Sequence, residues 1–485
     1  DAVLESGALC EGAICYTGDL FDPARGKYSL EYYTGIAREL QKAGVHILAV
    51  KDMAGVCRPR AIAALVKALK EETGLPVHFH THDTSGIAAA SVLAAVEAGC
   101  DAVDGALDAM SGLTSQPNLS AIAAALAHTE RDPGLSQQAL HQASTYFEGV
   151  RRFYAPFESD IRAGTADVYR HEMPGGQYTN LREQARALGL EHRWSEVSQA
   201  YADVNRLFGD IVKVTPTSKV VGDMALMMVA NDLTPAQVAD PAHEVAFPES
   251  VVALFKGELG FPPDGFPREL SRKVLKSEPP AAYRPGDHLP PVDLEAARAR
   301  AAQAAGTELD DRQLASTLMY PKVAGEFHQH LQTHGDVSVL PTPTFFYGLQ
   351  PGDEVALEID SGKTLLVSLQ TIHEDEAAGV AKVQFELNGQ SRMTSVARAG
   401  AAAGAQREVA EPGNPLHVGA PMPGVIVTVA VSAGQHVQAG ATLLSLEAMK
   451  METHMTAERD GVIEQMLVKP GDRVQAKDLL LVWRA

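Results

Sequence analysis

Two neighbouring segments of this sequence carry side chains that could bind a metal ion. Residues 78–83 read His-Phe-His-Thr-His-Asp. If this segment is a strand, His80 and His82 project to the same side, where neutral imidazoles can bind Zn²⁺, Mn²⁺ or Co²⁺. A single histidine here would be an ordinary core residue, and we interpret His78 as structural. The alternation therefore predicts a divalent metal site with His80 and His82 as ligands.

The other segment, residues 51–55, reads Lys-Asp-Met-Ala-Gly and ends the preceding apolar run. Lys51 either forms an ion pair at the end of a strand or belongs to an active site. An ammonium group cannot bind a metal, but the carbamate that a lysine forms with CO₂ can. The spacing alone leaves both roles open.

Two further segments contain candidate functional residues. Residues 214–223, Val-Thr-Pro-Thr-Ser-Lys-Val-Val-Gly-Asp, read by themselves as a helix start with hydroxyl groups that could cap it. Near the C-terminus, a shift of 37 residues places Gly-Val-Ile at 424–426 on Gly-Val-Ile at 461–463. The turn between these repeats contains Lys450 between two methionines. An ordinary surface lysine is the alternative, but the repeat, the turn and the methionines together indicate a lysine presented to another protein.

The hydrophobic pattern predicts the elements that position these residues. From residue 8 to about 130, short apolar runs alternate with Ala-rich amphipathic helices, which predicts a parallel α/β sheet. The expected strands are 13–17, 45–50, 76–80 and 102–106, and the expected helices are 31–43, 60–73 and 88–98. Parallel sheets place chemistry at the C-terminal ends of their strands. Asp19, Lys51, His80, His82 and Asp104 lie at these ends.

Beyond residue 135 the sequence pattern changes twice, first to long helices and then to a mixture of helices and strands. Residues 135 to about 275 predict long amphipathic helices, including 182–188 and 194–208. A Pro-rich stretch to residue 291 then precedes expected helices at 294–304 and 320–332 and expected strands over 354–392, with a hairpin turn at Asn388-Gly389. The two repeats near the C-terminus predict a flattened β-barrel with pseudo-twofold symmetry.

Composition narrows the class of protein. The 485 residues are 45% hydrophobic and 21% charged, which is typical of folded globular proteins. Lys and Arg total 41 against 61 Asp and Glu, so the net charge of −20 disfavours binding to nucleic acid or to an anionic membrane. The four cysteines include no CxxC pair, which favours a reducing compartment, and no apolar run is long enough to cross a membrane. We expect a cytoplasmic protein, and the start at Asp1 leads us to expect a fragment.

The C-terminal segment from about residue 417 resembles the biotinyl carrier domain of biotin-dependent carboxylases. The attachment lysine of that domain lies in the same Ala-Met-Lys-Met sequence, which stands here at 448–451. Lipoyl domains share the fold but lack the two flanking methionines. The resemblance implies that Lys450 carries biotin and that a biotin protein ligase attaches it.

Lys-Asp-Met-Ala-Gly followed by His-Thr-His-Asp resembles the carboxyltransferase domain shared by pyruvate carboxylases, oxaloacetate decarboxylases and transcarboxylases. In that domain a divalent metal is held by a carboxylated lysine, two histidines and an aspartate. The resemblance implies N6-carboxylated Lys51, His80 and His82 as ligands of Zn²⁺, Mn²⁺ or Co²⁺, while the aspartate belongs to a first barrel strand that this chain does not contain. It also implies that Thr215 relays a proton between the methyl group of pyruvate and biotin, because a hydroxyl can donate and accept together.

Residues 171–181, His-Glu-Met-Pro-Gly-Gly-Gln-Tyr-Thr-Asn-Leu, and residues 345–349 and 385–390 resemble the pyruvate carboxylase family in particular. The implied fold is multidomain. Its parts are the second half of a carboxyltransferase TIM barrel (1–134), a helical extension (135–276), an α+β allosteric linking domain (277–400), an Ala/Gly/Pro linker (401–413) and an all-β biotinyl carrier domain (414–485).

The implied reaction makes oxaloacetate from pyruvate and bicarbonate, with ATP and Mg²⁺ used by a biotin carboxylase domain upstream; it serves anaplerosis and gluconeogenesis. This chain would transfer the carboxyl group of carboxybiotin to pyruvate. The family also implies a homotetramer and an acyl-CoA activator. Two alternatives stay open: the alpha subunit of an oxaloacetate decarboxylase, which needs a membrane partner, and a non-catalytic biotin carrier and assembly module. We expect residues 1–485 alone to fold poorly in the half barrel and to make no oxaloacetate.

Overall fold

The computed structural model describes residues 2–23, 26–276, 283–375, 380–397, 408–411, 414–448 and 451–484. The chain forms two compact units, one comprising Asp1–Gly286 and Arg407–Ala485 and the other Asp287–Gln406. Among the described helices, none has both the length and the apolar character needed to span a membrane.

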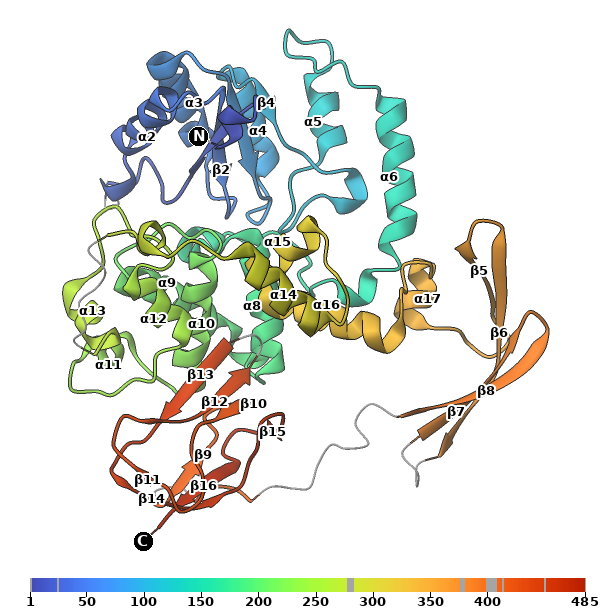
Figure 1. The fold of residues 1–485 in the computed structure, drawn as a ribbon. Coiled ribbons are helices and arrows are strands. Elements are labelled where there is room, and N and C mark those ends of the chain that lie inside the picture. The colour runs from blue at the N-terminus through green and yellow to red at the C-terminus, as the bar shows by residue number, and fades with distance from the viewer. Residues whose placement is uncertain are drawn as a thin grey trace. The chain divides into compact units, whose positions relative to one another are not determined.

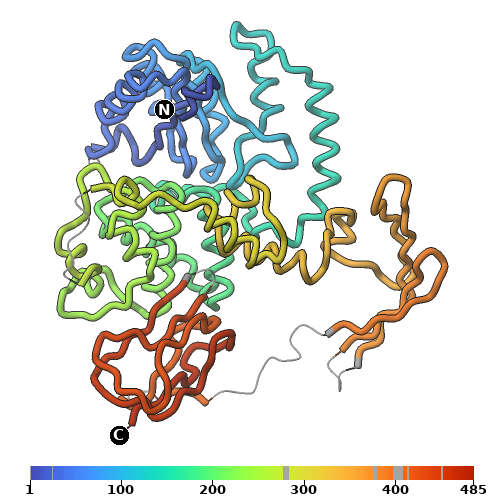
Figure 2. The backbone as a smooth tube through the Cα atoms, in the orientation of Figure 1, coloured from blue at the N-terminus to red at the C-terminus, as the bar shows by residue number. Residues whose placement is uncertain are grey.

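A four-stranded parallel sheet, in the order β1-β2-β3-β4, forms the N-terminal part of the first unit (Figure 1). Its strands are β1 (Glu11–Cys15), β2 (Ile47–Asp52), β3 (Val77–Thr81) and β4 (Ala102–Val103), and its helices are α1 (Ala2–Glu5), α2 (Leu30–Lys42), α3 (Pro59–Thr73), α4 (Ala88–Glu97), α5 (Leu119–Leu126) and α6 (Gln137–Arg151). Leu48, Val77 and Phe79 are fully buried, as expected for central parallel strands covered by helices. Helices α5 and α6 run side by side (Figures 1 and 2). The predicted α/β architecture is confirmed.

The bounds of all four strands differ from the prediction. Strands β2 and β3 begin and end two residues and one residue later than predicted. Strand β1 ends at Cys15 rather than at residue 17, because the backbone N–H and C=O of Thr17 both bond to the hydroxyl of Tyr33 instead of extending the ladder. Strand β4 has two residues rather than five. Beyond it, the backbone of Ala106 bonds to Pro117 and Leu119, which draws the chain away from β3.

Local sequence accounts for the helix ends that place the loops of the site. Helix α2 begins after Ser29, whose hydroxyl accepts a hydrogen bond from the Tyr32 N–H. Helix α3 begins at Pro59 and ends before Gly74, which adopts a left-handed conformation with φ of 67°. At Gly74 the chain can therefore turn directly from α3 into β3.

A helical layer follows in the same unit. Its helices are α7 (Val168–His171), α8 (Gly175–Ala187), α9 (Trp194–Leu207), α10 (Thr217–Ala230), α11 (Pro235–Ala239), α12 (Glu249–Lys256) and α13 (Arg268–Val274). Helix α10 is buried almost all round and packs against α8, α9 and α12, which explains its near-continuous apolar sequence. The predicted helices at 182–188 and 194–208 correspond to α8 and α9.

The C-terminal part of this unit is all-β. Its strands are β9 (His417–Gly419), β10 (Gly424–Val429), β11 (His436–Val437), β12 (Thr442–Ala448), β13 (Met451–Thr456), β14 (Gly461–Met466), β15 (Arg473–Val474) and β16 (Leu479–Trp483). They form two sheets, β13-β12-β10-β15 and β11-β14-β16-β9. Strands β10, β11 and β12 recur 37 residues later as β14, β15 and β16, so the predicted duplication is present in the structure.

The second unit contains helices and an antiparallel sheet. The helices are α14 (Leu294–Ala305), α15 (Asp311–Met319), α16 (Pro321–His334) and α17 (Thr342–Tyr347), and the strands are β5 (Glu354–Asp360), β6 (Lys363–Asp375), β7 (Val380–Leu387) and β8 (Gln390–Ala397). The predicted hairpin turn joins β7 to β8. Both of its residues, Asn388 and Gly389, have positive φ, as a two-residue type I′ turn requires.

Candidate active site

Lys51 and His80 lie opposite each other on adjacent parallel strands. In the register of β2 and β3, Lys51 pairs with His80, and Asp52 pairs with Thr81. Because side chains alternate along a strand, Lys51 and His80 share one face of the sheet and Asp52 points to the other. The buried carboxylate of Asp52 accepts hydrogen bonds from the Thr81 hydroxyl and from two backbone N–H groups of the loop after β2, at Val56 and Cys57. Asp52 therefore fixes the strand ends that carry Lys51 and His80.

The imidazoles of His80 and His82 turn their Nε2 atoms toward each other, 3.4 Å apart. Each ring has an acceptor at its other nitrogen. Nδ1 of His80 lies 2.7 Å from the Asp104 carboxylate, and Nδ1 of His82 lies 2.7 Å from the Thr114 carbonyl oxygen. In their neutral form, both rings therefore carry the proton on Nδ1, which leaves two Nε2 lone pairs facing one space.

This geometry fits a metal ion. Imidazole nitrogens bind Zn²⁺ at ~2.0–2.1 Å, so two ligands of a tetrahedral ion lie about 3.4 Å apart. Hydrogen bonds from Nδ1–H to a carboxylate and a carbonyl are the outer contacts that orient metal-bound histidines. In the described part of the chain, no group of three His, Cys, Asp or Glu side chains is arranged to hold a metal ion. The two histidines would thus supply part of a ligand set.

Burial lowers the pKa of His82, and the nearby charges of His80 and Lys51 lower it further, although the bond to Thr114 opposes them. The neutral form that a metal requires is therefore favoured at His82.

The pKa of His78 shifts in the opposite direction. Burial acts to lower its pKa, but bonds to the carboxylates of Glu11 and Asp104 outweigh burial and raise it. These two ion pairs support the interpretation of His78 as a structural residue.

The Lys51 ammonium has no hydrogen-bond or ion-pair partner among the described residues. The alternative role, an ion-paired lysine at a strand end, therefore has no partner in this part of the chain. Its half-buried side chain lies on the face that carries His80 and is close enough to His82 to lower the pKa of that ring.

The two remaining predicted site residues lie on other elements. Thr215 is exposed just before α10, and no contact joins it to the paired histidines within the described residues. Lys450 lies outside the described residues. The strands beside it are described, and Ala448 pairs with Met451 in the antiparallel register of β12 and β13.

Two residues that hold the histidines have no predicted role. The sequence marks Asp104 only as a polar residue at a strand end, although such a position can supply a partner for a histidine on the adjacent strand. Gly175 begins α8, and a Cβ atom there would lie 2.6 Å from Nδ1 of His82. Only a glycine lets the backbone of α8 approach the His82 ring this closely. No local sequence pattern reveals this contact.

A pocket of about 260 Å³ opens beside this site but does not include the histidines. It lies at the loops after β1 and β2 and is lined by Gly18, Asp19, Phe21, Asp22, Val56, Arg58, Tyr169 and Glu172. Arg58 forms an ion pair with Asp19 and lies over the ring of Tyr169. The paired histidines, rather than this pocket, carry the arrangement suited to chemistry.

Comparison with known families divides the chain into three matches. Residues 19–146 match the HMGL-like family, residues 168–368 match a conserved carboxylase domain, and residues 416–482 match the domain of biotin-requiring enzymes. The last match covers the duplicated β domain. The HMGL-like match covers most of the parallel sheet and its helices, in accordance with a TIM-barrel segment.

Relatives extend the match over nearly the whole chain. The sequence is 46% identical over 482 residues to pyruvate carboxylase of Bacillus subtilis (strain 168) and 41% identical over 489 residues to mitochondrial pyruvate carboxylase of Homo sapiens. Each alignment covers 99% of this chain but only 42% and 41% of the relative. The carboxyl transferase domain of Rhizobium etli pyruvate carboxylase, solved with pyruvate and biocytin, is 58% identical, with a TM-score of 0.78 over 82% of this chain and 68% of that one. The chain belongs to the pyruvate carboxylase family.

The complete multifunctional pyruvate carboxylase from Rhizobium etli gives the same result, with a TM-score of 0.77 and 57% identity over 99% of this chain and 44% of that one. The chain thus spans less than half the length of the complete pyruvate carboxylases that it matches, and it corresponds to their C-terminal portion.

Proposed function

We propose that this chain performs the carboxyl transfer half of a biotin-dependent pyruvate carboxylase, in which pyruvate becomes oxaloacetate. The observation that carries the proposal is the pair of facing Nε2 atoms of His80 and His82, in a chain 58% identical to a carboxyl transferase domain solved with pyruvate and biocytin. We further propose that the domain boundaries follow residues 134, 276, 400 and 413.

Lys51, as its N6-carboxylate, would hold a divalent metal together with His80 and His82. Zn²⁺, Mn²⁺ and Co²⁺ all suit imidazole and carbamate ligands. When bound, the metal would supply positive charge next to the developing enolate. Asp104 and the Thr114 carbonyl keep both histidine rings oriented for this role.

Thr215 would move the proton. Its hydroxyl can accept a proton from the methyl group of pyruvate while it donates its own, so the net charge on Thr215 does not change. Its exposure before α10 supports this role, because the hydroxyl has no competing hydrogen bond in the described residues.

Lys450 would carry biotin at the connection between β12 and β13. When bound there, biotin would supply the carboxyl group and accept the methyl proton of pyruvate. A biotin protein ligase would attach it. In the complete protein, ATP and Mg²⁺ would serve an upstream biotin carboxylase domain, and we expect a homotetramer with an acyl-CoA activator.

The test is an assay of the full-length gene product with pyruvate, bicarbonate and MgATP. Oxaloacetate formation that depends on ATP and is blocked by avidin supports the proposal. ATP-independent decarboxylation of oxaloacetate as the only activity would instead favour an oxaloacetate decarboxylase. Biotinylation without either reaction would favour a non-catalytic carrier.

A further inference from the structure

The segment that leads to Thr215 has no regular structure of its own. Residues 209–214 connect α9 to α10 without a helix or strand. Asn205 of α9 and Thr217 of α10 bond to this segment, and side chains from more distant parts of the chain also hold it. At its start, Lys27 donates to the Gly209 carbonyl at 2.9 Å, and the hydroxyl of Tyr28 donates to the Asp210 carbonyl. These contacts anchor the beginning of the segment to the loop that follows β1.

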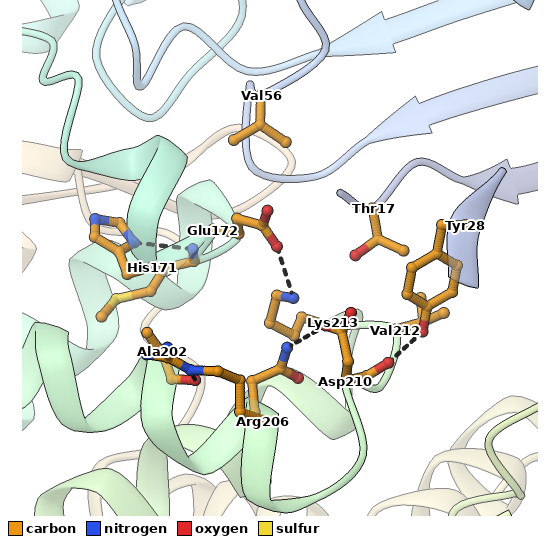
Figure 3. Close-up of polar contacts among 12 residues, drawn as sticks. Thr17, Tyr28, Val56, His171, Glu172, Ala202, Arg206, Asp210, Val212 and Lys213 are labelled. Carbon is orange, nitrogen blue, oxygen red and sulfur yellow. Dashed lines mark hydrogen bonds and ion pairs between the residues drawn. The ribbon is translucent and has the colours of Figure 1, made fainter. Parts of the chain in front are cut away.

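The end of the segment is held by a buried ion pair. Nζ of Lys213, two residues before Thr215, lies 3.0 Å from Oε2 of Glu172 (Figure 3). The two side chains are 3% and 8% exposed. Within the described residues, Glu172 is the hydrogen-bond partner of the Lys213 ammonium. A buried ammonium held by one carboxylate has little freedom to move away from it.

Glu172 belongs to a short buried connection that reaches the paired histidines. It follows α7 with a φ of 52°, between His171 and Met173, which are both buried. Three residues after Glu172, the Gly175 N–H donates to the carbonyl of Met53, which directly follows the strand β2 that carries Lys51. Gly175 also packs directly on the ring of His82. Residues 172–175 therefore touch the histidine site at one end and Lys213 at the other.

We propose that Glu172 and Lys213 are positioning residues: their ion pair fixes the hydroxyl of Thr215 relative to the paired histidines. The inference rests on the proton relay proposed for Thr215. It adds that the relay is held in place through residues 172–175 and not by its own helix alone. A displacement near 1 Å can cost on the order of 100-fold in rate when reacting groups must be aligned.

The first measurement needs no turnover. In the full-length protein, Lys213→Met should increase amide hydrogen exchange over residues 211–215. Lys70→Met serves as the control, because Lys70 forms an exposed ion pair with Asp101 that does not touch this segment. Unchanged exchange in Lys213→Met would overturn the inference, whether or not the wild type makes oxaloacetate.

The second measurement is kinetic. We expect Lys213→Met to lower kcat 10- to 100-fold, with the KM for pyruvate within about twofold of wild type. The isotope effect with trideuterated pyruvate should increase, because a misplaced relay makes proton transfer limit the rate. A loss of folded enzyme alone would lower kcat and leave the isotope effect unchanged, and that result would contradict the positioning role.

Two further variants separate the possible failures. The double variant Glu172→Gln/Lys213→Met removes both charges of the pair, and it should still show the lower kcat and the larger isotope effect. Near-wild-type kcat in this folded variant would refute the role of the pair. In a Thr215→Ala background, Lys213→Met should reduce kcat less than twofold further. If Thr215→Ala itself is fully active, the proposed relay is wrong, and the inference is lost with it.

Discussion

The position that a Cβ atom would take on Gly175 lies 2.6 Å from Nδ1 of His82 and 2.6 Å from the carbonyl oxygen of Thr114. These two atoms are also hydrogen-bonded to each other. The first turn of α8 therefore closes over the bond that orients His82. A methyl group at this point must push the ring, the carbonyl or the helix aside.

Gly175→Ala should consequently reduce the metal content of the full-length protein and lower its stability by ~1–3 kcal/mol, the usual cost of overpacking a buried site. Gly176→Ala is the matched control, because nothing lies within 4 Å of its Cβ position. Metal analysis after gel filtration and thermal unfolding would measure both effects. Equal metal content in the two variants would contradict this interpretation of α8.

Asp104→Asn should weaken metal binding about 10- to 100-fold, the usual effect of losing an outer contact to a metal-bound histidine. The carboxylate of Asp104 accepts from both His80 and His78, and a neutral amide cannot replace both bonds. Metal retention during titration with a chelator measures the loss. Asp101→Asn is the control, since Asp101 bonds to Lys70 and to the Val77 N–H instead. Similar losses in both variants would argue against orientation of His80.

Thr215→Ala should reduce oxaloacetate formation by the full-length protein at least ~100-fold, because it removes the hydroxyl that we propose as the proton relay. ATP-dependent carboxylation of biotin should be spared, since the role proposed for Thr215 concerns only the transfer to pyruvate. Thr215→Ser keeps a hydroxyl and should retain much of the activity. The role assigned to Thr215 is wrong if the alanine variant makes oxaloacetate at a near-wild-type rate.

Biotin should be attached at Lys450 and at no other lysine. Of the lysines in the chain, it is the one that lies in Ala-Met-Lys-Met between the repeated halves. Peptide mass mapping after co-expression with a biotin ligase gives the site, and Lys450→Arg should abolish the modification. An unmodified Lys450 peptide, or lipoate at this position, would end the assignment.

Acid should destabilise the helical layer through His171. Burial lowers the pKa of His171 to about 4, with smaller contributions from nearby charges. Between pH 6.5 and 4 the unfolded chain then binds more protons than the folded one, so the free energy of unfolding falls as the pH falls, by up to about 3 kcal/mol. Thermal unfolding of wild type and His171→Asn at pH 7 and pH 4.5 measures this. The variant should lose less stability on acidification, and parallel losses would contradict the prediction.

The sequence alone determined the local elements and the identity of the candidate ligands. The alternation of short apolar runs with amphipathic helices was enough to predict the parallel α/β sheet, because burial of one helix face imposes a period near 3.6 residues. The 37-residue repeat predicted the duplicated β domain. Strict alternation in a strand also predicted that His80 and His82 share a side, since neighbouring side chains point to opposite faces.

Only the tertiary structure decided what surrounds these residues. The acceptor for His82 comes from Thr114, 32 residues later, and the partner of Lys213 is Glu172, 41 residues earlier. The strand end at Cys15 likewise depends on the hydroxyl of Tyr33, which belongs to α2. Such pairings arise when separate elements pack against each other. A local pattern records the backbone period of one element, but it holds no information about which side chain another element brings to it.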